Sequence, residues 1–448
     1  MSKIVIIGGS DVGIIAGLRI RELDKNSDVT IVSNNNFPNF SICGIPFFIG
    51  GEVKHYKDLA HRTAAEICST GLKLMLNSTA QEIDKANKKV RVIDENKNIV
   101  NLDYDKLVIA TGGKSIKPEI EGIDLPDVFF LRWIDEAIRI DEHLKKKQPN
   151  SVVVIGGGYI GLEMTEAFIR RGLKVTLIEF AERILTTVDS EFSEIVKNKL
   201  EEKGAKIFTG KQVKAIKKDN GQLKVIAEPD LSITGDMVLV AVGAIPETTL
   251  AKSIGIETGI KNAIKVNTKL ETNIPDIYAG GDCVESFNAI TKKPVYIALG
   301  TTAHKHGRII AENICGMNLE YPGTLGTQSI KLFDLVVART GLNDAEAIAA
   351  GFQPQTISFE TWDHKVYYPP AYKTKIRFTA DKITKRILGC QILGNINAEI
   401  SKRIDIIAVA IFKEVTVPEF IQMDLSYTPP LSSPWDPVQM AAQEWLKL

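Results

Sequence analysis

The segment SVVVIGGGYIGLEMTEAFIRRGLKVTLIEF, residues 151–180, constrains the fold of this 448-residue sequence more than any other. A short β-branched run leads into Gly156, Gly158 and Gly161, and a helix-like stretch and a second apolar run follow. In this pattern the glycines permit a tight turn, a close approach of backbone to phosphate, and close helix–strand packing. The segment therefore predicts a strand–helix–strand unit whose helix N-terminus holds a pyrophosphate.

Glu179 ends the second apolar run of this segment. A carboxylate at that place, about 20 residues after the glycine turn, accepts hydrogen bonds from an adenosine ribose. The same carboxylate repels a 2′-phosphate. The sequence therefore predicts a nicotinamide dinucleotide site that prefers NADH and leaves NADPH open, with Arg183 as the cation that would accommodate the extra phosphate.

An earlier segment, KIVIIGGSDVGIIAG, repeats the pattern with Gly8 and Gly13. Ser10 stands where the middle glycine is usual, and Ser33 stands where the ribose-binding carboxylate is expected. Taken alone, this segment fits a strand–helix packing turn as well as a nucleotide site. Two such openings in one chain indicate two cofactors with electron flow between them.

Three further segments place glycine turns directly after apolar strands. They are YDKLVIATGGKS (residues 104–115), DMVLVAVGAIPET (236–248) and TNIPDIYAGGDCVE (272–285), the last of which carries Asp282.

Cys43 lies in NFSICGIPFFIGG, where a two-cysteine redox centre would supply a second thiol but position 48 is Phe48. The other cysteines are far apart and form no CxxC pair, which argues against a disulfide framework or a metal site and for a reducing cytoplasm. We expect buried, structural roles for them: Cys68, Cys283, Cys315 and Cys390. Lys+Arg and Asp+Glu both number 55, and no long apolar run occurs, so we expect neither a nucleic-acid partner nor a membrane span.

These motifs, in this order, resemble the FAD-dependent pyridine nucleotide–disulfide oxidoreductases over essentially the whole chain. The resemblance implies an α/β fold with two Rossmann-like domains, for FAD and NAD, and a C-terminal α+β dimerisation domain that makes a homodimer. It implies FAD binding by Gly8, Gly13, Thr111, Gly112 and Asp282. It implies nicotinamide dinucleotide binding by Gly156, Gly158, Gly161, Glu179 and Gly243, with Tyr159 as an aromatic lid over the flavin.

The same resemblance gives the domain order. Residues 1–115 and 250–322 are expected to form the FAD domain, 116–249 the NAD(P)H domain and 323–448 the interface domain. In the last of these, the sequence predicts antiparallel strand pairs and two helices. No rhodanese-like extension is expected after Leu448.

Cys43 stands where the single-cysteine branch, which includes coenzyme A–disulfide reductases and NADH oxidases, carries its redox sulfur. A single sulfur forms either a mixed disulfide with a small thiol or a sulfenic acid. A reactive thiolate needs a positive or dipolar environment, such as a helix N-terminus or an oxidised flavin. Tyr368, ahead of Tyr367, and Tyr427 match tyrosines that approach the redox cysteine from the partner subunit in the disulfide-reducing members.

Three functions remain open at this stage. The first is reduction of small disulfides, persulfides or polysulfide; the second is oxygen or peroxide reduction; the third is electron transfer to a protein partner. Water-forming oxidases carry a histidine where this chain has Asp11. Coenzyme A is a candidate thiol, although Glu22 replaces the arginine expected for its phosphates, and Arg19, Arg21, His61 and Arg62 are the cations that could compensate.

Overall fold

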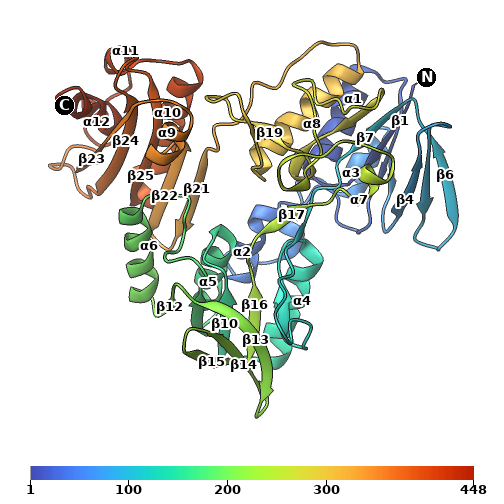
Figure 1. Cartoon of the computed structure of the whole chain (residues 1–448), viewed down its shortest axis with the longest axis horizontal. Helices are drawn as coiled ribbons and strands as arrows, with labels where there is room; N and C mark the ends of the chain where they lie inside the picture. The colour runs from blue at the N-terminus through green and yellow to red at the C-terminus, as the bar shows by residue number, and fades with distance from the viewer. Residues whose placement is uncertain (1) are drawn as a thin grey trace.

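The computed structural model describes residues 2–448. These residues form three units, each built around its own sheet and called a layer below (Figure 1). The first is a parallel sheet of five strands, the arrangement that the N-terminal glycine turn predicts. In spatial order its strands are β18 (Ile277–Ala279), β7 (Lys106–Ile109), β1 (Lys3–Ile7), β2 (Asp28–Val32) and β3 (Lys73–Met75). Because β18 comes from much later in the chain, the first sheet is completed by a segment that follows the whole second sheet.

Helix α1 (Asp11–Leu23) follows β1 and packs against α8 (Gly300–Ile314). An antiparallel three-stranded sheet, β4 (Thr79–Asp84), β5 (Lys89–Ile93) and β6 (Ile99–Asp103), lies at the outer side of this region (Figure 1). Short helices α3 (Ala64–Ser69) and α7 (Thr249–Ser253) complete it, whereas α2 (Ile45–Ile49) packs against helices of the second layer in a separate apolar cluster. The helices and sheet bury one apolar cluster centred on strands β1, β2 and β7.

The second layer is another parallel sheet of five strands, coloured green in Figure 1. In spatial order its strands are β12 (Lys206–Phe208), β11 (Lys174–Ile178), β10 (Ser151–Ile155), β16 (Met237–Val240) and β9 (Val128–Phe130). The accompanying helices are α4 (Ile134–Lys147), α5 (Tyr159–Arg170) and α6 (Ser190–Glu202). An antiparallel sheet of β13 (Gln212–Asp219), β14 (Gln222–Glu228) and β15 (Leu231–Gly235) packs beside them.

The chain passes between these two layers twice, and the two passages pair with each other. Strand β8 (Gly113–Ser115) leads out of the first layer and β17 (Ala244–Pro246) leads back, in antiparallel register. A small hairpin of β19 (Ser286–Phe287) and β20 (Pro294–Val295) follows the return. The predicted domain boundaries stay a prediction, but the passages lie near residues 115 and 249, where the boundaries were expected.

The third layer is an antiparallel sheet. Its strands are β21 (Gln328–Leu332), β22 (Leu335–Gly341), β25 (Ile387–Asn395), β24 (Lys373–Asp381) and β23 (Pro354–Trp362) in spatial order. The expectation of two helices here was wrong, since the structure contains α9 (Asp344–Ala349), α10 (Ile400–Phe412), α11 (Val417–Ile421) and α12 (Pro437–Trp445). The short α9 and α11 are specified by capping boxes, at Asn343 and Thr416, rather than by a long apolar repeat.

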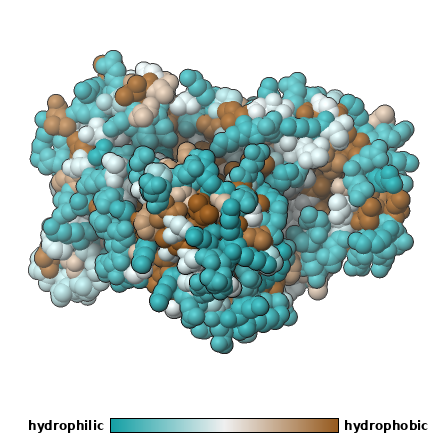
Figure 2. Space-filling view, turned by 60° about the horizontal axis from the view of Figure 1, so that its bottom comes forward, coloured by the Kyte–Doolittle hydropathy of each residue, from teal (hydrophilic) through white to brown (hydrophobic). Residues whose placement is uncertain are grey.

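The overall architecture is the expected α/β fold with two Rossmann-like units and a C-terminal α+β unit. Figure 2 shows a mostly hydrophilic face with hydrophobic side chains gathered near its centre. Within residues 2–448, no helix combines the length and apolar character that crossing a bilayer requires.

Candidate active site

The glycine turn between β10 and α5 has the backbone geometry that its sequence predicts. Gly156 has φ +109°, a conformation that favours glycine, and a Cβ at Gly161 would overlap the carbonyl oxygen of Gly156. A Cβ at Gly158, by contrast, would meet no protein atom within 4 Å. Protein packing thus accounts for the first and third glycines, whereas the middle one faces open space that a ligand can fill.

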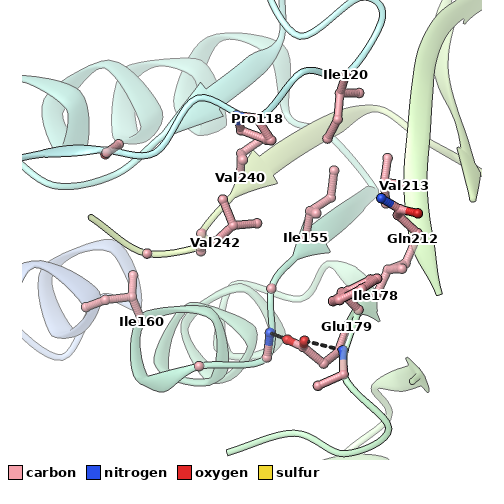
Figure 3. A pocket seen from close by; sticks show the side chains of 18 of the residues that line it. Pro118, Ile120, Ile155, Ile160, Ile178, Glu179, Gln212, Val213, Val240 and Val242 are labelled. Carbon is pink, nitrogen blue, oxygen red and sulfur yellow. Dashed lines mark hydrogen bonds between the residues drawn. The ribbon is translucent and has the colours of Figure 1, made fainter. Parts of the chain in front are cut away.

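That open space is a cavity of about 920 Å³ between the β10–α5 turn, the ends of β11 and β16, and the segment around Pro118 (Figure 3). Gly156, Gly158, Tyr159, Glu179 and Gly243 all line it. Its walls include the apolar side chains labelled in Figure 3: Pro118, Ile120, Ile155, Ile160, Ile178, Val213, Val240 and Val242. The volume, the apolar walls and the exposed turn fit a dinucleotide.

Glu179 lies at the edge of this cavity with its carboxylate already oriented. One oxygen accepts a hydrogen bond from the Gly157 N–H (2.5 Å) and the other from the Ala181 N–H (2.7 Å). Arg183, the predicted partner for a 2′-phosphate, instead donates to the carbonyl oxygen of Val188 (2.5 Å) and does not line the cavity. A carboxylate therefore lies near the expected ribose position, and Lys211 and Lys214 also line the cavity.

The turn between β1 and α1 has the same backbone plan but a different surrounding. Gly8 has φ +125°, and a Cβ at Gly13 would overlap the Gly8 carbonyl oxygen. A Cβ at Gly9 would lie only 2.7 Å from Cβ of Ser33, which is buried. Ser33 is therefore a small residue packed against the turn, where the second unit carries Glu179.

Residues around this first turn fit an acceptor-rich cofactor such as FAD. The main-chain N–H of Asn39 donates to the Gly9 carbonyl oxygen (3.2 Å), and its side-chain Nδ2 is buried without a hydrogen-bond acceptor. A buried unpaired donor costs about 1–3 kcal/mol, so a phosphate or ring acceptor there would relieve it. A narrow cavity lined by Gly9, Ser10 and Ser41 adjoins the turn.

The other predicted FAD contacts lie where the two passages between the layers meet. The Thr111 hydroxyl donates to the carbonyl oxygen of Glu247 (2.5 Å), and the Glu247 N–H donates to the carbonyl oxygen of Gly112 (2.9 Å). Asp282 forms an ion pair with Arg132 (2.5 Å), whose Nε donates to the carbonyl oxygen of Gly113 (2.9 Å). Sequence reasoning missed Arg132, which lies two residues after the end of β9.

Cys43 lies in a single turn of helix, Ile42–Gly44, immediately before α2, and its side chain is exposed. Partial desolvation raises the pKa of the Cys43 thiol, and the nearby carboxylates of Glu163, Asp11 and Asp282 raise it further, whereas Arg132 acts in the opposite direction. The positive environment expected for a thiolate is thus not supplied by the chain alone. Arg132 is the nearby cation that lowers the pKa of this thiol.

The other cysteines do not share one environment, and the expectation of burial was wrong for Cys68. Cys283 and Cys390 are buried, and burial raises the pKa of the Cys283 thiol to about 11. Cys315 is half-buried and Cys68 is exposed. Cys68 lies on the short helix α3, whose six residues bury only Ile67. The helix therefore leaves the Cys68 side chain outside the core.

Glu163 is a second residue that sequence reasoning missed. It lies one turn after Tyr159 on α5, and burial together with Glu166 raises its pKa to about 7. Glu166, also on α5, is buried and pairs with Lys331 of β21 (2.8 Å), which pairs in turn with Glu52 after α2 (3.1 Å). A network of charges from all three layers therefore lies behind the cysteine-bearing segment. The sequence feature that could have indicated this residue is the glutamate that ends GYIGLE, residues 158–163, two residues after the third glycine.

Tyr368 and Tyr427 lie on two exposed loops of the C-terminal unit. Among residues 2–448, no hydrogen bond joins either of them to Cys43, and Figure 1 shows the C-terminal unit on the opposite side from β1 and α1. Tyr367, which the sequence ranked below Tyr368, is the one beside Tyr427: partial desolvation and the Tyr427 hydroxyl raise the pKa of Tyr367.

Tyr159, the predicted aromatic lid on α5, accepts a weak hydrogen bond from Thr187 (3.5 Å).

The cations considered for a large thiol substrate are unequally available. Arg19 pairs with the buried Glu312 (2.7 Å) and with Glu22 (3.1 Å). Arg21 donates to the main-chain carbonyl oxygens of Ser27 (2.8 Å) and Thr70 (3.2 Å). His61 and Arg62 are exposed on the segment that runs beside residues 39–44.

Comparison with protein families identifies the two parts of the chain. Residues 2–307 match the family model described as pyridine nucleotide-disulphide oxidoreductase. Residues 327–437 match the dimerisation domain of the same family. The FAD and NAD(P)H cofactors expected from the sequence are those on which this family depends.

Individual relatives match over nearly the full length. The chain is 35% identical to a CoA-dependent NAD(P)H sulfur oxidoreductase of Pyrococcus furiosus, covering 98% of each chain. It is 32% identical to an NADH oxidase of Methanocaldococcus jannaschii, covering 99% of each. The crystal structure of reduced CoADR-RHD from Bacillus anthracis superposes with a TM-score of 0.96 at 33% identity, covering all of this chain and 80% of that one. The chain belongs to the pyridine nucleotide-disulphide oxidoreductase family.

Proposed function

We propose that this protein is a homodimeric NAD(P)H-dependent flavoenzyme that reduces small disulfides, persulfides or polysulfide through Cys43. The observation that carries the proposal is an exposed single cysteine beside the first glycine turn, with Phe48 where a second thiol would be needed. Names of relatives that handle sulfur or coenzyme A support the substrate class. The match to the dimerisation domain supports the homodimer, and the free cysteines support a reducing cytoplasmic location.

The cofactors would be held by the two glycine turns. Gly8, Gly13, Thr111, Gly112 and Asp282 are proposed to hold FAD, with the unpaired amide of Asn39 as an additional donor. Gly156, Gly158, Glu179 and Gly243 line the large cavity and are proposed to hold the nicotinamide dinucleotide, while Gly161, packed against Gly156, is proposed to set the turn. FAD, when bound, accepts a hydride from NADH and passes the electron pair to a sulfur in contact with it.

The chemistry at Cys43 balances as follows. The Cys43 thiolate attacks one sulfur of R–S–S–R, which forms Cys43–S–S–R and releases RS⁻. Two electrons that originate in NADH then cleave the mixed disulfide, which restores the Cys43 thiolate and releases the second RS⁻. Each RS⁻ takes a proton, so one disulfide, one NADH and one net proton give two RSH and NAD⁺.

The tyrosines are proposed to assist the departing thiolates. A tyrosine hydroxyl donates a hydrogen bond and remains protonated near neutral pH. Tyr427 and Tyr368, or its neighbour Tyr367, are exposed on the C-terminal unit and would reach Cys43 of the partner subunit. Coenzyme A is proposed as one candidate for R, with His61 and Arg62 as the cations available to its phosphates, since Arg19 and Arg21 are already engaged.

A second candidate is an NADH oxidase, which the similarity to the Methanocaldococcus jannaschii enzyme favours. In that reaction one NADH, oxygen and a proton would first give hydrogen peroxide and NAD⁺. The Cys43 thiolate, this peroxide and a proton would then give Cys43–SOH and water. NADH and a proton then return the sulfenic acid to the thiol with a second water and NAD⁺.

Anaerobic turnover of wild type and Cys43→Ser tests the proposal. Wild type should oxidise NADH with coenzyme A disulfide, cystine or polysulfide, whereas Cys43→Ser should lose all three activities and still reduce its flavin with NADH. In a parallel aerobic assay, vigorous oxygen reduction by a wild type with negligible disulfide turnover would promote the oxidase. Undiminished disulfide turnover in Cys43→Ser would refute both functions and favour an electron-transfer role with a protein partner.

A further inference from the structure

The two loops that carry the tyrosines are joined beneath the surface by a buried polar cluster. Loop A comprises residues 363–372 and carries Tyr367 and Tyr368; loop B comprises residues 424–436 and carries Tyr427. The tyrosine residues are 43–73% exposed, whereas the polar residues below them are at most 8% exposed: Asp363, His364, Arg403 and Asp436. Exposed loops are ordinarily mobile, so buried charge at their base requires an explanation.

Arg403, on α10, contacts both loops through main-chain and side-chain oxygens. Its Nη2 donates to the carbonyl oxygen of Asp363 in loop A (2.7 Å) and to that of Leu431 in loop B (3.3 Å). Its Nε donates to Asp436 at the end of loop B (3.3 Å), and its Nη1 donates to the carbonyl oxygen of Ala398. One planar guanidinium thus fixes the separation of the two loops.

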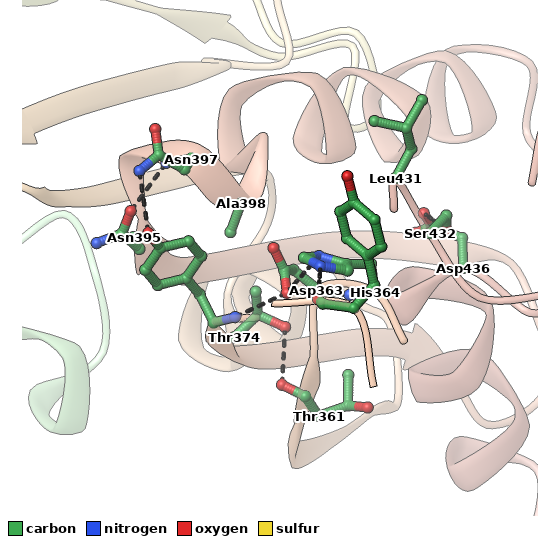
Figure 4. A network of polar contacts seen from close by, with 12 residues as sticks. Thr361, Asp363, His364, Thr374, Asn395, Asn397, Ala398, Leu431, Ser432 and Asp436 are labelled. Carbon is green, nitrogen blue, oxygen red and sulfur yellow. Dashed lines mark hydrogen bonds and ion pairs between the residues drawn. The ribbon is translucent and has the colours of Figure 1, made fainter. Parts of the chain in front are cut away.

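Asp363 and His364 organise loop A itself, as Figure 4 shows. Asp363 Oδ1 accepts hydrogen bonds from the N–H groups of His364 (3.0 Å) and Tyr372 (2.8 Å) and lies 3.0 Å from His364 Nδ1. The other ring nitrogen, Nε2, lies 2.9 Å from the carbonyl oxygen of Tyr368. The imidazole therefore connects the base of the loop to the backbone of the tyrosine.

Loop B is held in a parallel way. The Ser432 hydroxyl donates to Asp436 Oδ2 (3.0 Å), and Asp436 Oδ1 caps α12 by accepting from the Val438 N–H (3.1 Å). A direct bond also crosses between the loops, from the Lys365 N–H to the carbonyl oxygen of Pro429 (3.3 Å). These contacts leave each tyrosine side chain exposed on a backbone that is fixed from below.

We infer that Arg403, together with the Asp363–His364 pair, is a positioning centre that presents Tyr427 and the tyrosines of loop A as one unit to the thiol released at the partner's redox cysteine. The inference rests on the proposed disulfide reduction. Burying a charged pair costs several kcal/mol unless its geometry is well satisfied. A buried arginine that donates to a main-chain carbonyl of each loop fixes loop geometry, which precise placement of a proton donor requires.

A double-mutant cycle on the holoenzyme tests this inference. Tyr427→Phe should lower kcat for coenzyme A disulfide by about 10–100-fold in wild type, because a single positioned donor is lost. Arg403→Lys keeps the charge but cannot span both loops, and should lower kcat by a similar factor without changing the KM for NADH. In the Arg403→Lys background, Tyr427→Phe should cost less than about 2-fold, because the unit is already disordered.

Arg386→Lys is the matched control, since Arg386 lies in the same unit and pairs with Glu414 (2.8 Å) away from both loops. In that background the full Tyr427→Phe effect should persist. The inference would be overturned if Tyr427→Phe lowered kcat by its full factor in the Arg403→Lys background. An unchanged kcat in Arg403→Lys alone would overturn it as well. If Arg403→Lys yields no folded dimer, His364→Gln replaces it under the same criteria. Disulfide turnover that survives Cys43→Ser would refute the proposed function instead.

Discussion

The two glycine turns of this chain share a backbone plan but differ in what lies beyond it. In both, the first glycine has a positive φ and the third lies against the carbonyl oxygen of the first. The middle position is Ser10 in one turn and Gly158 in the other, and the strand that follows ends in Ser33 or Glu179. The second turn adjoins a cavity of about 920 Å³, whereas the first adjoins a narrow cavity of about 20 Å³.

The helices that follow the turns differ in the same sense. Helix α1 begins with Asp11, where α5 begins with Tyr159, and the place of Glu163 on α5 is taken by Ile15 on α1. The comparison teaches that the first and third glycines serve the fold, which is why both turns have them. The middle position, the strand end and the helix face differ between the turns, because each turn is proposed to bind a different cofactor. Each prediction below tests one part of this division.

The largest effect is expected when the third glycine of either turn is changed. In Gly13→Ala and Gly161→Ala the new Cβ would overlap a main-chain carbonyl oxygen, so the backbone must shift. We expect each to lower the free energy of unfolding by about 3–5 kcal/mol, measured by denaturant titration.

Gly158→Ala is the matched control within the second turn, because its Cβ meets open space. Its stability should stay near that of wild type while NADH binding weakens and FAD is retained. An equal destabilisation by Gly158→Ala and Gly161→Ala would contradict the separation of folding and binding roles.

A smaller effect, dependent on pH, is expected at Glu163. Its pKa in the folded protein is about 7 against an ordinary 4.5, so between these values the folded state holds a proton that the unfolded state has lost. The stability from the neutral acid is complete below about pH 4.5 and is lost as the pH rises through 7.

Glu163→Gln stays neutral, so it should gain stability relative to wild type as the pH rises from 5 to 8, by about 2 kcal/mol. Chemical denaturation of both proteins across this range measures the difference. A constant difference between the two would show that Glu163 does not titrate there. In the same variant, the Cys43 thiol should react faster with an alkylating reagent at pH 7, because the Glu163 carboxylate that raises its pKa is removed.

The smallest effect is expected at the strand end. Glu179→Gln keeps one oxygen to accept from the Gly157 N–H, removes the charge and replaces the oxygen that accepts from the Ala181 N–H by an amide NH2. We expect the ratio of kcat/KM for NADPH to that for NADH to rise about 10-fold, equivalent to about 1.4 kcal/mol. A wild type that already prefers NADPH would refute the role assigned to this carboxylate.

The fold and both nucleotide turns were predictable because glycine spacing reports backbone constraints that are local in sequence. The same locality explains the errors: the extra helices α9 and α11 depend on capping residues rather than on a repeat, and Cys68 lies on a helix too short to bury it. Sequence patterns also did not indicate Arg132, Glu163 or the Arg403 cluster. Their environments are made by segments far apart in the chain, such as the contact of Arg132 with Asp282.

The site roles of the tyrosines, Cys43 and the glycines stay predictions, since they concern groups that bind or react. What the structure adds is a physical distinction among them. Gly13 and Gly161 are explained by packing alone, whereas Gly158 and the unpaired Asn39 amide are explained only if something binds. Partial desolvation and nearby carboxylates raise the pKa of the Cys43 thiol.

The most direct test of the central claim is the mass of the protein after reaction with a small disulfide. Anaerobic holoenzyme, in a Cys68→Ser background to remove the other exposed thiol, is treated with coenzyme A disulfide and then with one equivalent of NADH. The account predicts one thiol adduct per chain, located on Cys43 by peptide mapping, which NADH releases completely. An adduct on Cys43 that survives while NADH is oxidised, or turnover without any adduct, would contradict it.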